Sequence, residues 1–219
     1  NRNTITTADG SGITAYDGAI VVAEDNIISG ASAGSGFGIS SSTVTANNNV
    51  IGPIGGWNGL WIYGTSDVIA ENNTIQDTAK EAVLIGEYHY LDQGWNVPTP
   101  TASRLYLANN QISNNTGTCN SQMYDGDFAC PAIHMFMSSA TLYDNTVTNN
   151  AGDGMRIKAS IVNAQRNTIE VSGFAANISL YDDNYGNKYG SIAYFSENTY
   201  TNATQVYNIT ESRVTVQSE

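Results

Sequence analysis

Four side chains in two short apolar segments carry the groups best suited to chemistry. His134 and Phe136 lie in one segment, and Arg156 and Lys158 lie in the next. The spacing from His134 to Asn145 equals the spacing from Arg156 to Asn167, and each of these asparagines opens an Asn-Thr pair. Imidazole, guanidinium and ammonium groups on an otherwise acidic protein suit the binding of an acidic sugar chain. That chemistry requires a fold that brings the two segments side by side.

The asparagines that follow these segments belong to a repeat that runs along nearly the whole chain. Asp144-Asn145-Thr146-Val147 has plain copies in Arg166-Asn167-Thr168-Ile169 and Glu197-Asn198-Thr199-Tyr200. With looser copies included, the repeated asparagines fall at positions 3, 26, 49, 73, 110, 145, 167 and 198. Four of the seven steps between them are nearly equal, and the other three are longer. A regular period of this length indicates a solenoid.

Each period contains about three short strands of alternating apolar and polar residues, separated by turn residues. This pattern predicts an all-β fold, a right-handed single-stranded parallel β-helix of about eight coils with three lateral insertions. We expect the repeated asparagines to adopt the left-handed backbone at one corner and to form a ladder of amide bonds between coils. The alternatives are disorder, which the phased Val and Ile disfavour, and a leucine-rich repeat, for which leucine is too scarce.

Stacking on this period places His134 beside Arg156 and Phe136 beside Lys158. Because the apolar residues between them are expected to point inward, these four side chains should point outward. Two aromatic residues fall in the same two columns several coils earlier. The predicted ligand-binding face therefore consists of Trp61, Tyr63, His134, Phe136, Arg156 and Lys158.

The three longer steps of the repeat contain insertions, at residues 87–100, 117–130 and 181–190. We expect the first two to emerge side by side from one edge of the solenoid, because they adjoin the same family of strands. Insertions on one face are where solenoids usually bind partners. The alternative is that they only cover strand edges or pack on a neighbouring domain. The aromatic binding candidates in them are Tyr88, Tyr90, Trp95 and Tyr124.

Two cysteines lie close together in the second insertion, Cys119 and Cys130. We expect a disulfide worth somewhat under about 3 kcal/mol; the alternative is two free thiols in a cytosolic protein. Five Asn-X-Ser/Thr sequons favour a secreted or cell-surface glycoprotein, although a repeat rich in Asn and Thr also generates them by chance. The candidate acceptors are Asn72, Asn114, Asn177, Asn202 and Asn208.

Composition narrows the class of partner. The chain has 8 Lys and Arg against 20 Asp and Glu, a net charge of −12, so it lacks the basic stripe that nucleic acid requires. No apolar run reaches the length of a membrane span, and no signal peptide is recognisable. The repeat is already in phase at Asn3. We therefore expect residues 1–219 to form one domain of a longer secreted or surface protein, whose other domains are candidate partners.

The segment Gly152-Asp153-Gly154-Met155-Arg156-Ile157-Lys158-Ala159-Ser160, together with the Asn-Thr-Ile motifs, resembles right-handed β-helix repeats. Such repeats occur in polysaccharide lyases, epimerases, glycoside hydrolases, phage tailspikes and non-catalytic surface proteins, so the resemblance implies a fold rather than an activity. Arg156-Ile157-Lys158 also resembles the substrate-binding element of polygalacturonases. The Asn-Thr-Asp, Asp-Asp and Gly-His-Gly motifs that this family carries upstream are absent there.

The resemblance to lyases implies a mechanism in which a basic side chain removes the proton beside a uronate carboxylate while a cation neutralises that carboxylate. Lys158 or Arg156 would be the base, and His134 would assist. Asp125-Gly126-Asp127 is too short to form a calcium loop alone and is more typical of a turn. The candidate calcium ligands are Asp125, Asp127 and Asp153.

These observations favour a non-catalytic extracellular β-helix. It would act as a rigid scaffold and bind a polysaccharide, a glycoprotein glycan or a protein partner through the insertions and the outward face. The alternative is a polysaccharide lyase or glycoside hydrolase that acts on an acidic polysaccharide, and a third hypothesis is a purely structural spacer. No cofactor is required by the first hypothesis, and calcium is the ion for which candidate ligands exist.

Overall fold

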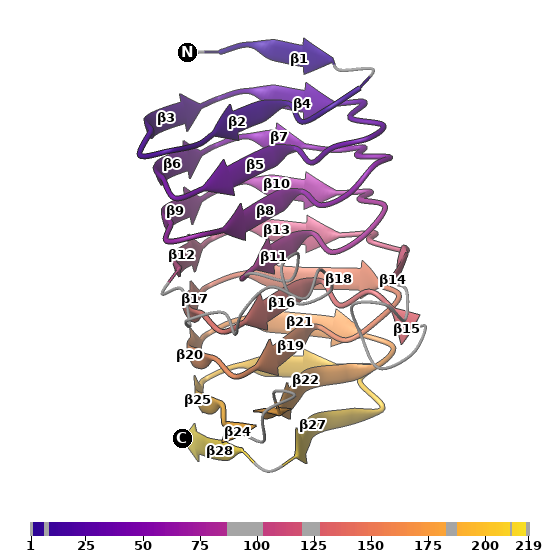
Figure 1. Ribbon diagram of the computed structural model, residues 1–219. Helices are drawn as coiled ribbons and strands as arrows, with labels where there is room; N and C mark the ends of the chain where they lie inside the picture. The colour runs from indigo at the N-terminus through magenta and orange to yellow at the C-terminus, as the bar shows by residue number, and fades with distance from the viewer. Residues whose placement is uncertain are drawn as a thin grey trace.

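In the computed structural model, which describes residues 2–6, 9–86, 103–119, 128–182, 188–210 and 212–217, the chain forms a parallel β-helix (Figure 1). Three parallel sheets of eight strands each, named A, B and C, run along its length. Successive coils each contribute one strand to sheet B, one to sheet C and one to sheet A. The two chain ends lie at opposite ends of the stack. The predicted all-β solenoid is confirmed.

The strands of each sheet follow the repeat. Sheet A contains β1 (Thr4–Thr6), β4 (Ile27–Ser29), β7 (Val50–Ile51), β10 (Thr74–Gln76), β13 (Gln111–Ser113), β18 (Thr146–Asn150), β21 (Thr168–Val171) and β26 (Thr199–Thr201). Sheet B contains β2 (Ile13–Ala15), β5 (Phe37–Ser40), β8 (Leu60–Tyr63), β11 (Val83–Ile85), β16 (Ile133–Phe136), β19 (Met155–Lys158), β22 (Phe174–Ser179) and β27 (Gln205–Thr210). Sheet C contains β3 (Ile20–Glu24), β6 (Thr43–Asn47), β9 (Asp67–Glu71), β12 (Arg104–Ala108), β17 (Ser139–Tyr143), β20 (Ile161–Gln165), β25 (Ile192–Ser196) and β28 (Arg213–Gln217).

Side chains alternate between the interior and the outside of the coil because successive residues of a strand point to opposite faces. The interior is filled by columns of like residues, one from each coil. Burial of each isoleucine in such a column stabilises the fold by about 1.5–3 kcal/mol. The column inside sheet A consists of Ile28, Ile51, Ile75, Ile112, Val147 and Ile169.

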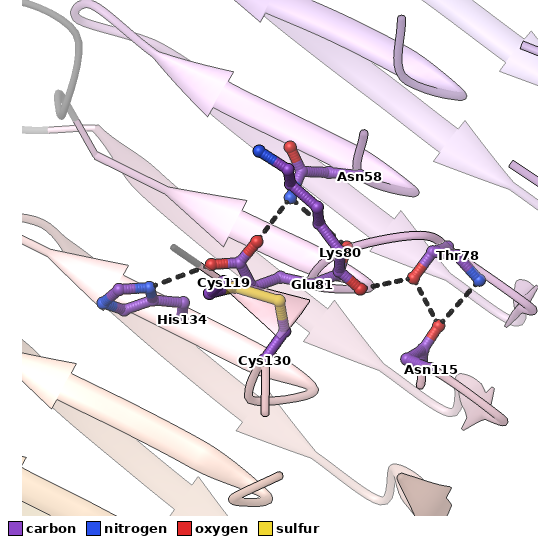
Figure 2. Close-up of a disulfide and its surroundings, with 8 residues drawn as sticks. All are labelled: Asn58, Thr78, Lys80, Glu81, Asn115, Cys119, Cys130 and His134. Carbon is purple, nitrogen blue, oxygen red and sulfur yellow. Dashed lines mark hydrogen bonds and ion pairs between the residues drawn. A yellow bond between two sulfur atoms is a disulfide. The ribbon is translucent and has the colours of Figure 1, made fainter. Parts of the chain in front are cut away.

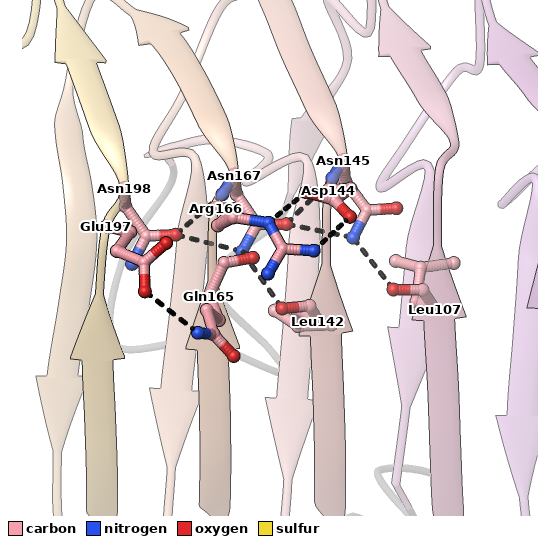
Figure 3. A network of polar contacts seen from close by, with 9 residues as sticks. All are labelled: Leu107, Leu142, Asp144, Asn145, Gln165, Arg166, Asn167, Glu197 and Asn198. Carbon is pink, nitrogen blue, oxygen red and sulfur yellow. Dashed lines mark hydrogen bonds and ion pairs between the residues drawn. The ribbon is translucent and has the colours of Figure 1, made fainter.

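The predicted asparagine ladder is present at the corner between sheets C and A (Figure 3). The side-chain amide of each ladder residue donates to the side-chain oxygen of the next, as from Asn110 to Asn145 at 3.0 Å and from Asn167 to Asn198 at 3.0 Å. The chain of bonds joins Asn3, Asn26, Asn49, Asn73, Asn110, Asn145, Asn167 and Asn198.

One detail of the ladder differs from the prediction. From Asn26 onward, the left-handed backbone belongs to the residue before each ladder asparagine, as at Asp144 (φ 54°) and Arg166 (φ 53°), and not to the asparagine itself. This arrangement directs the asparagine side chain into the corner, where its oxygen also accepts the backbone N–H of the previous ladder residue. The preceding residue can then be any polar residue that tolerates a positive φ.

The insertions adjoin sheet B at both ends of its strands. The first insertion, residues 87–100, falls between β11 and β12 in the sequence but lies outside the described residues, so the prediction that it emerges beside the second insertion stays a prediction. The second insertion, residues 117–130, precedes β16. The third insertion follows β22. The second insertion contains the antiparallel strands β14 (Thr118–Cys119) and β15 (Phe128–Ala129). The third contains the antiparallel strands β23 (Tyr181–Asp182) and β24 (Lys188–Tyr189). Sheet B is therefore the sheet that the insertions flank.

Candidate functional site

The outer side of sheet B carries the column of residues that the repeat predicts. His134 pairs with Arg156 in the next coil. On its other side His134 pairs with Leu84, which pairs in turn with Trp61. The predicted neighbour relation between His134 and Arg156 is therefore confirmed, and Trp61 lies two coils before His134 in the same column.

An aromatic cluster covers the outer side of sheet B in its first coils. The rings of Trp61 and Tyr63 stack with centroids 4.5 Å apart, and Trp57 lies 5.2 Å from Trp61. Tyr16 lies 6.4 Å from Tyr63, and Lys80 places its Nζ 5.0 Å from the centroid of a Trp57 ring. Stacked aromatic rings beside a cation form a surface on which a sugar ring and an acidic group can both bind.

Sequence reasoning missed Tyr16 and Trp57. Tyr16 directly follows β2 and opens a turn, and Trp57 lies in the bend before β8. Space for Tyr16 depends on Gly38, which occupies the column position next to Trp61. A Cβ at Gly38 would lie 3.3 Å from the Tyr16 hydroxyl. The signal in the sequence was Gly38 itself, a glycine at an outward position beside Trp61, which leaves room for a neighbouring aromatic side chain.

Basic residues are concentrated around the same sheet. All three lysines of the sequence adjoin sheet B: Lys80 precedes β11, Lys158 ends β19, and Lys188 lies in the insertion after β22. Arg156 lies in β19 together with Lys158. On a protein of net charge −12, this face is where cations gather, which favours an anionic ligand.

Two other arginines are held by carboxylates away from this face. Arg104 in sheet C places its Nε 2.6 Å from Asp67. Arg166, at the ladder corner, lies 2.7 Å from Asp144 (Figure 3). Its guanidinium group packs over the ring of Tyr143 at 3.9 Å. Their positive charge is consequently compensated locally.

Glu81 and His134 form a buried acid–histidine pair (Figure 2). In the outward column, His134 lies between Leu84 and Arg156. The exposed fractions of His134 and Glu81 are 0% and 1%, and Nδ1 of His134 lies 3.2 Å from Oε1 of Glu81. Asn58 donates its side-chain N–H to the other carboxylate oxygen at 2.9 Å. Burial lowers the pKa of His134 below its usual 6.5; the hydrogen bond and charge of Glu81 partly oppose this, and the charges of Arg156 and Lys158 reinforce it.

Phe136 is buried outside the coil in a second apolar cluster. It pairs with Lys158 in register, as predicted, but packs with Met137 and both cysteines. Tyr181 meets its ring edge-on at 5.1 Å, and Nζ of Lys158 lies 5.6 Å from the Tyr181 ring. Contact of Phe136 or His134 with a ligand stays a prediction, and it would require the residues that cover them to move.

The predicted disulfide between Cys119 and Cys130 is present. Of the predicted calcium ligands, Asp153 accepts hydrogen bonds from the Phe174 backbone at 2.9 Å and from Asn177 at 3.1 Å, which gives it a structural role. Two more ligand candidates and four binding candidates lie outside the described residues, namely Asp125, Asp127, Tyr88, Tyr90, Trp95 and Tyr124.

The sequons differ in exposure. The side chains of Asn72, Asn114 and Asn202 are exposed. Asn177 and Asn208 are half-buried on sheet B and are bonded to each other, with Nδ2 of Asn208 3.3 Å from Oδ1 of Asn177. The first three positions are therefore the better candidates for modification.

A groove of about 760 Å³ lies along the outer side of sheet C, on strands from β6 to β25. It was missed because outward apolar residues in the middle strand of each coil look like ordinary strand formers. Exposed apolar side chains nevertheless line this sheet: Ile20, Val22, Ile69, Tyr106, Ile161 and Tyr194.

Comparison with known proteins shows what the chain is similar to. The family model for the right handed beta helix region matches residues 1–157. Among solved structures, ORF18 of Geobacillus virus E2 is similar in fold, with 11% sequence identity and a TM-score of 0.46, and the match covers 96% of this chain. The chain spans 39% of the length of that protein. No curated protein sequence gives a match. The described residues contain no helix that is long and apolar enough to cross a membrane.

Proposed function

Because the chain belongs to the right-handed β-helix family, in which the fold is shared and activity depends on the site, we propose that it is a non-catalytic extracellular scaffold that binds acidic carbohydrate through the outer side of sheet B. The observation that carries this proposal is the meeting of two features on one sheet. The aromatic cluster around Trp61 supplies stacking surfaces, and the lysines supply positive charge.

The geometry suits an extended ligand that lies along the solenoid axis. Trp61 and Arg156 occupy one outward column, so successive units of a sugar chain would meet first aromatic and then cationic side chains. Leu84 and His134, which lie between them in the column, are buried, so the aromatic and cationic contacts would lie three coil spacings of about 4.8 Å apart. Stacking on aromatic rings provides affinity, and the basic residues select for carboxylate or sulfate groups.

Extracellular location is part of the proposal. The Cys119–Cys130 disulfide supports it, since such bonds persist in oxidising surroundings. The exposed sequons at Asn72, Asn114 and Asn202 are compatible with it.

A glycan array probed with the purified protein, followed by calorimetry on the best acidic oligosaccharide, tests the proposal. Trp61→Ala should weaken binding about tenfold, equivalent to about 1.4 kcal/mol. The matched control is Tyr106→Ala, which removes an exposed aromatic residue from sheet C. If no glycan binds, or if the two variants weaken binding equally, the sheet B site is not the binding site.

The second candidate function is that of a polysaccharide lyase, favoured by the Glu81–His134 pair beside Arg156. With Glu81 ionised, Nδ1 of His134 would carry the proton and the imidazole would be held in one tautomer. Formation of unsaturated product from uronate-containing polysaccharides, with and without a chelator, distinguishes the two functions. Activity that is lost in Lys158→Ala would replace the binding proposal by a catalytic one.

A further inference from the structure

Four buried side chains meet on the outer side of sheet B, at the insertion before β16 (Figure 2). Glu81, Cys119 and Cys130 place a carboxylate oxygen and two sulfur atoms within 4.8 Å of one another. His134 lies on the far side of the Glu81 carboxylate. The disulfide offers this carboxylate neither a positive charge nor a hydrogen-bond donor, and its hydrogen bonds are made with Asn58 and His134 instead.

We propose that reduction of the disulfide converts this cluster into a binding site for one thiophilic divalent cation of the zinc class, with Cys119, Cys130 and Glu81 as ligands. Zinc binds thiolate sulfur at about 2.3 Å and carboxylate oxygen at about 2.0–2.2 Å, so ligand atoms within 4.8 Å of one another can surround one ion. Two thiolates select zinc over calcium or magnesium, which prefer oxygen ligands.

The backbone keeps the two sulfur atoms together without the covalent bond. Strands β14 and β15 pair Cys119 with Phe128. The backbone N–H of Cys130 donates to the carbonyl of Gly117 at 3.0 Å. The α-carbons of the two cysteines lie 5.1 Å apart. Reduction therefore leaves two neighbouring thiols in a buried, preformed position.

The third ligand is also held in place. Asn58 and His134 each bond one oxygen of the Glu81 carboxylate, at 2.9 Å and 3.2 Å. Partners of this kind orient a ligating carboxylate from outside the coordination shell. Each carboxylate oxygen has two lone pairs, so a carboxylate that accepts hydrogen bonds can also bind a metal ion.

Positive charge near the cluster would favour the form in which the metal ion is bound. Two thiolates and a carboxylate bring three negative charges, one more than a divalent cation compensates. Arg156 and Lys158, in the adjacent strand, are close enough to lower the pKa of His134. Their positive charge would compensate the excess negative charge of the buried site.

The chemistry balances with a dithiol as reductant. Two electrons and two protons pass from the dithiol to the disulfide, the S–S bond breaks, and the reductant closes its own disulfide. Each cysteine sulfur then carries one proton. Binding of the cation releases both protons as the thiols become thiolates. The cross-link occupies the cluster in oxidising surroundings, and the metal ion would occupy it in reducing ones.

Cobalt(II) is the probe for the test. The full chain is reduced with a dithiol, freed of the reductant under argon and titrated with Co²⁺. With water as the fourth ligand, we expect one equivalent to give the strong visible bands of tetrahedral cobalt and a thiolate-to-cobalt charge-transfer band, and one equivalent of Zn²⁺ to remove them. The oxidised protein should give neither. A reduced protein without these bands overturns the proposal, whatever the variants do.

Variants identify the ligands. Cys119→Ser should weaken the thiolate-to-cobalt charge-transfer band, because one of the two thiolates is lost, and Glu81→Gln should weaken cobalt binding at least about tenfold. The matched control is Glu197→Gln, which changes an exposed acid at the ladder corner. Circular dichroism verifies that each variant is folded. Equal affinity of Glu81→Gln and Glu197→Gln would show that cobalt binds elsewhere.

Discussion

Asn145 donates from its side-chain amide to the side-chain oxygen of Asn167 at 2.9 Å, across one coil spacing (Figure 3). The same amide also donates to the backbone carbonyl of Leu107 at 2.8 Å. Both bonds are buried, so Asn145 satisfies polar groups at a part of the corner that water does not reach.

The ladder makes a prediction for stability. Asn145→Ala should lower the free energy of unfolding by about 1–3 kcal/mol, because it leaves buried donors and acceptors of neighbouring coils without partners. Asn163→Ala removes an exposed asparagine of sheet C and should change the free energy of unfolding by less than about 0.5 kcal/mol. Urea denaturation followed by circular dichroism measures both. Equal losses would mean that the ladder contributes no more than a surface amide.

The disulfide should stabilise its surroundings modestly. The double variant Cys119→Ser with Cys130→Ser should lose somewhat under about 3 kcal/mol, because the closed loop is short. Hydrogen exchange should quicken first in β16, where Phe136 packs against both cysteines. Exchange that quickens equally in β4, far along the stack, would contradict a local effect.

The protonation of His134 should make the protein less stable in acid. The unfolded chain binds the imidazole proton near pH 6.5, whereas the buried side chain binds it only at lower pH. Between these two pKa values the unfolded state holds more protons, so the free energy of unfolding falls as the pH falls through 6.5 and levels off below the folded pKa.

The charged groups that face His134 are Glu81, Arg156 and Lys158. His134→Gln lacks the titrating imidazole and should lose less stability than the wild type between about pH 7 and pH 5. Urea denaturation across that interval measures the difference. Parallel curves for the two proteins would show that His134 does not cause the acid sensitivity.

The sequons make a prediction for modification. In a secretory host that glycosylates sequons, Asn72 and Asn114 should be occupied, because their side chains are exposed. Asn177 and Asn208 should be occupied far less, since a glycan there would break their bond to each other and crowd sheet B. Mass spectrometry of peptides measures occupancy. Full occupancy of Asn177 in folded, secreted protein would contradict the described sheet B surface.

The sequence predicted the fold well because one physical constraint repeats in every coil. The equal spacing of His134 from Asn145 and of Arg156 from Asn167 fixed which side chains would be neighbours. Glu81 was missed as the partner of His134 because it is distant in the sequence and lies outside the strands. Contacts of turns and insertions do not follow the repeat. For that reason Trp61 and Tyr63 of the aromatic cluster were predicted, whereas Tyr16 and Trp57 were missed.

Salt dependence should separate the two parts of the proposed carbohydrate site. Lys80→Gln removes the charge beside Trp57 and should both weaken binding of an acidic oligosaccharide and flatten its dependence on ionic strength. Trp61→Phe should weaken binding while the slope with salt stays that of the wild type, because the ring carries no charge. The control is Arg104→Gln, whose guanidinium group is bonded to Asp67 on sheet C. Calorimetry at two or more salt concentrations measures each slope. If Lys80→Gln keeps the wild-type slope, Lys80 does not contact the charged groups of the ligand, and the part of the site around Trp57 would then bind through the aromatic rings alone.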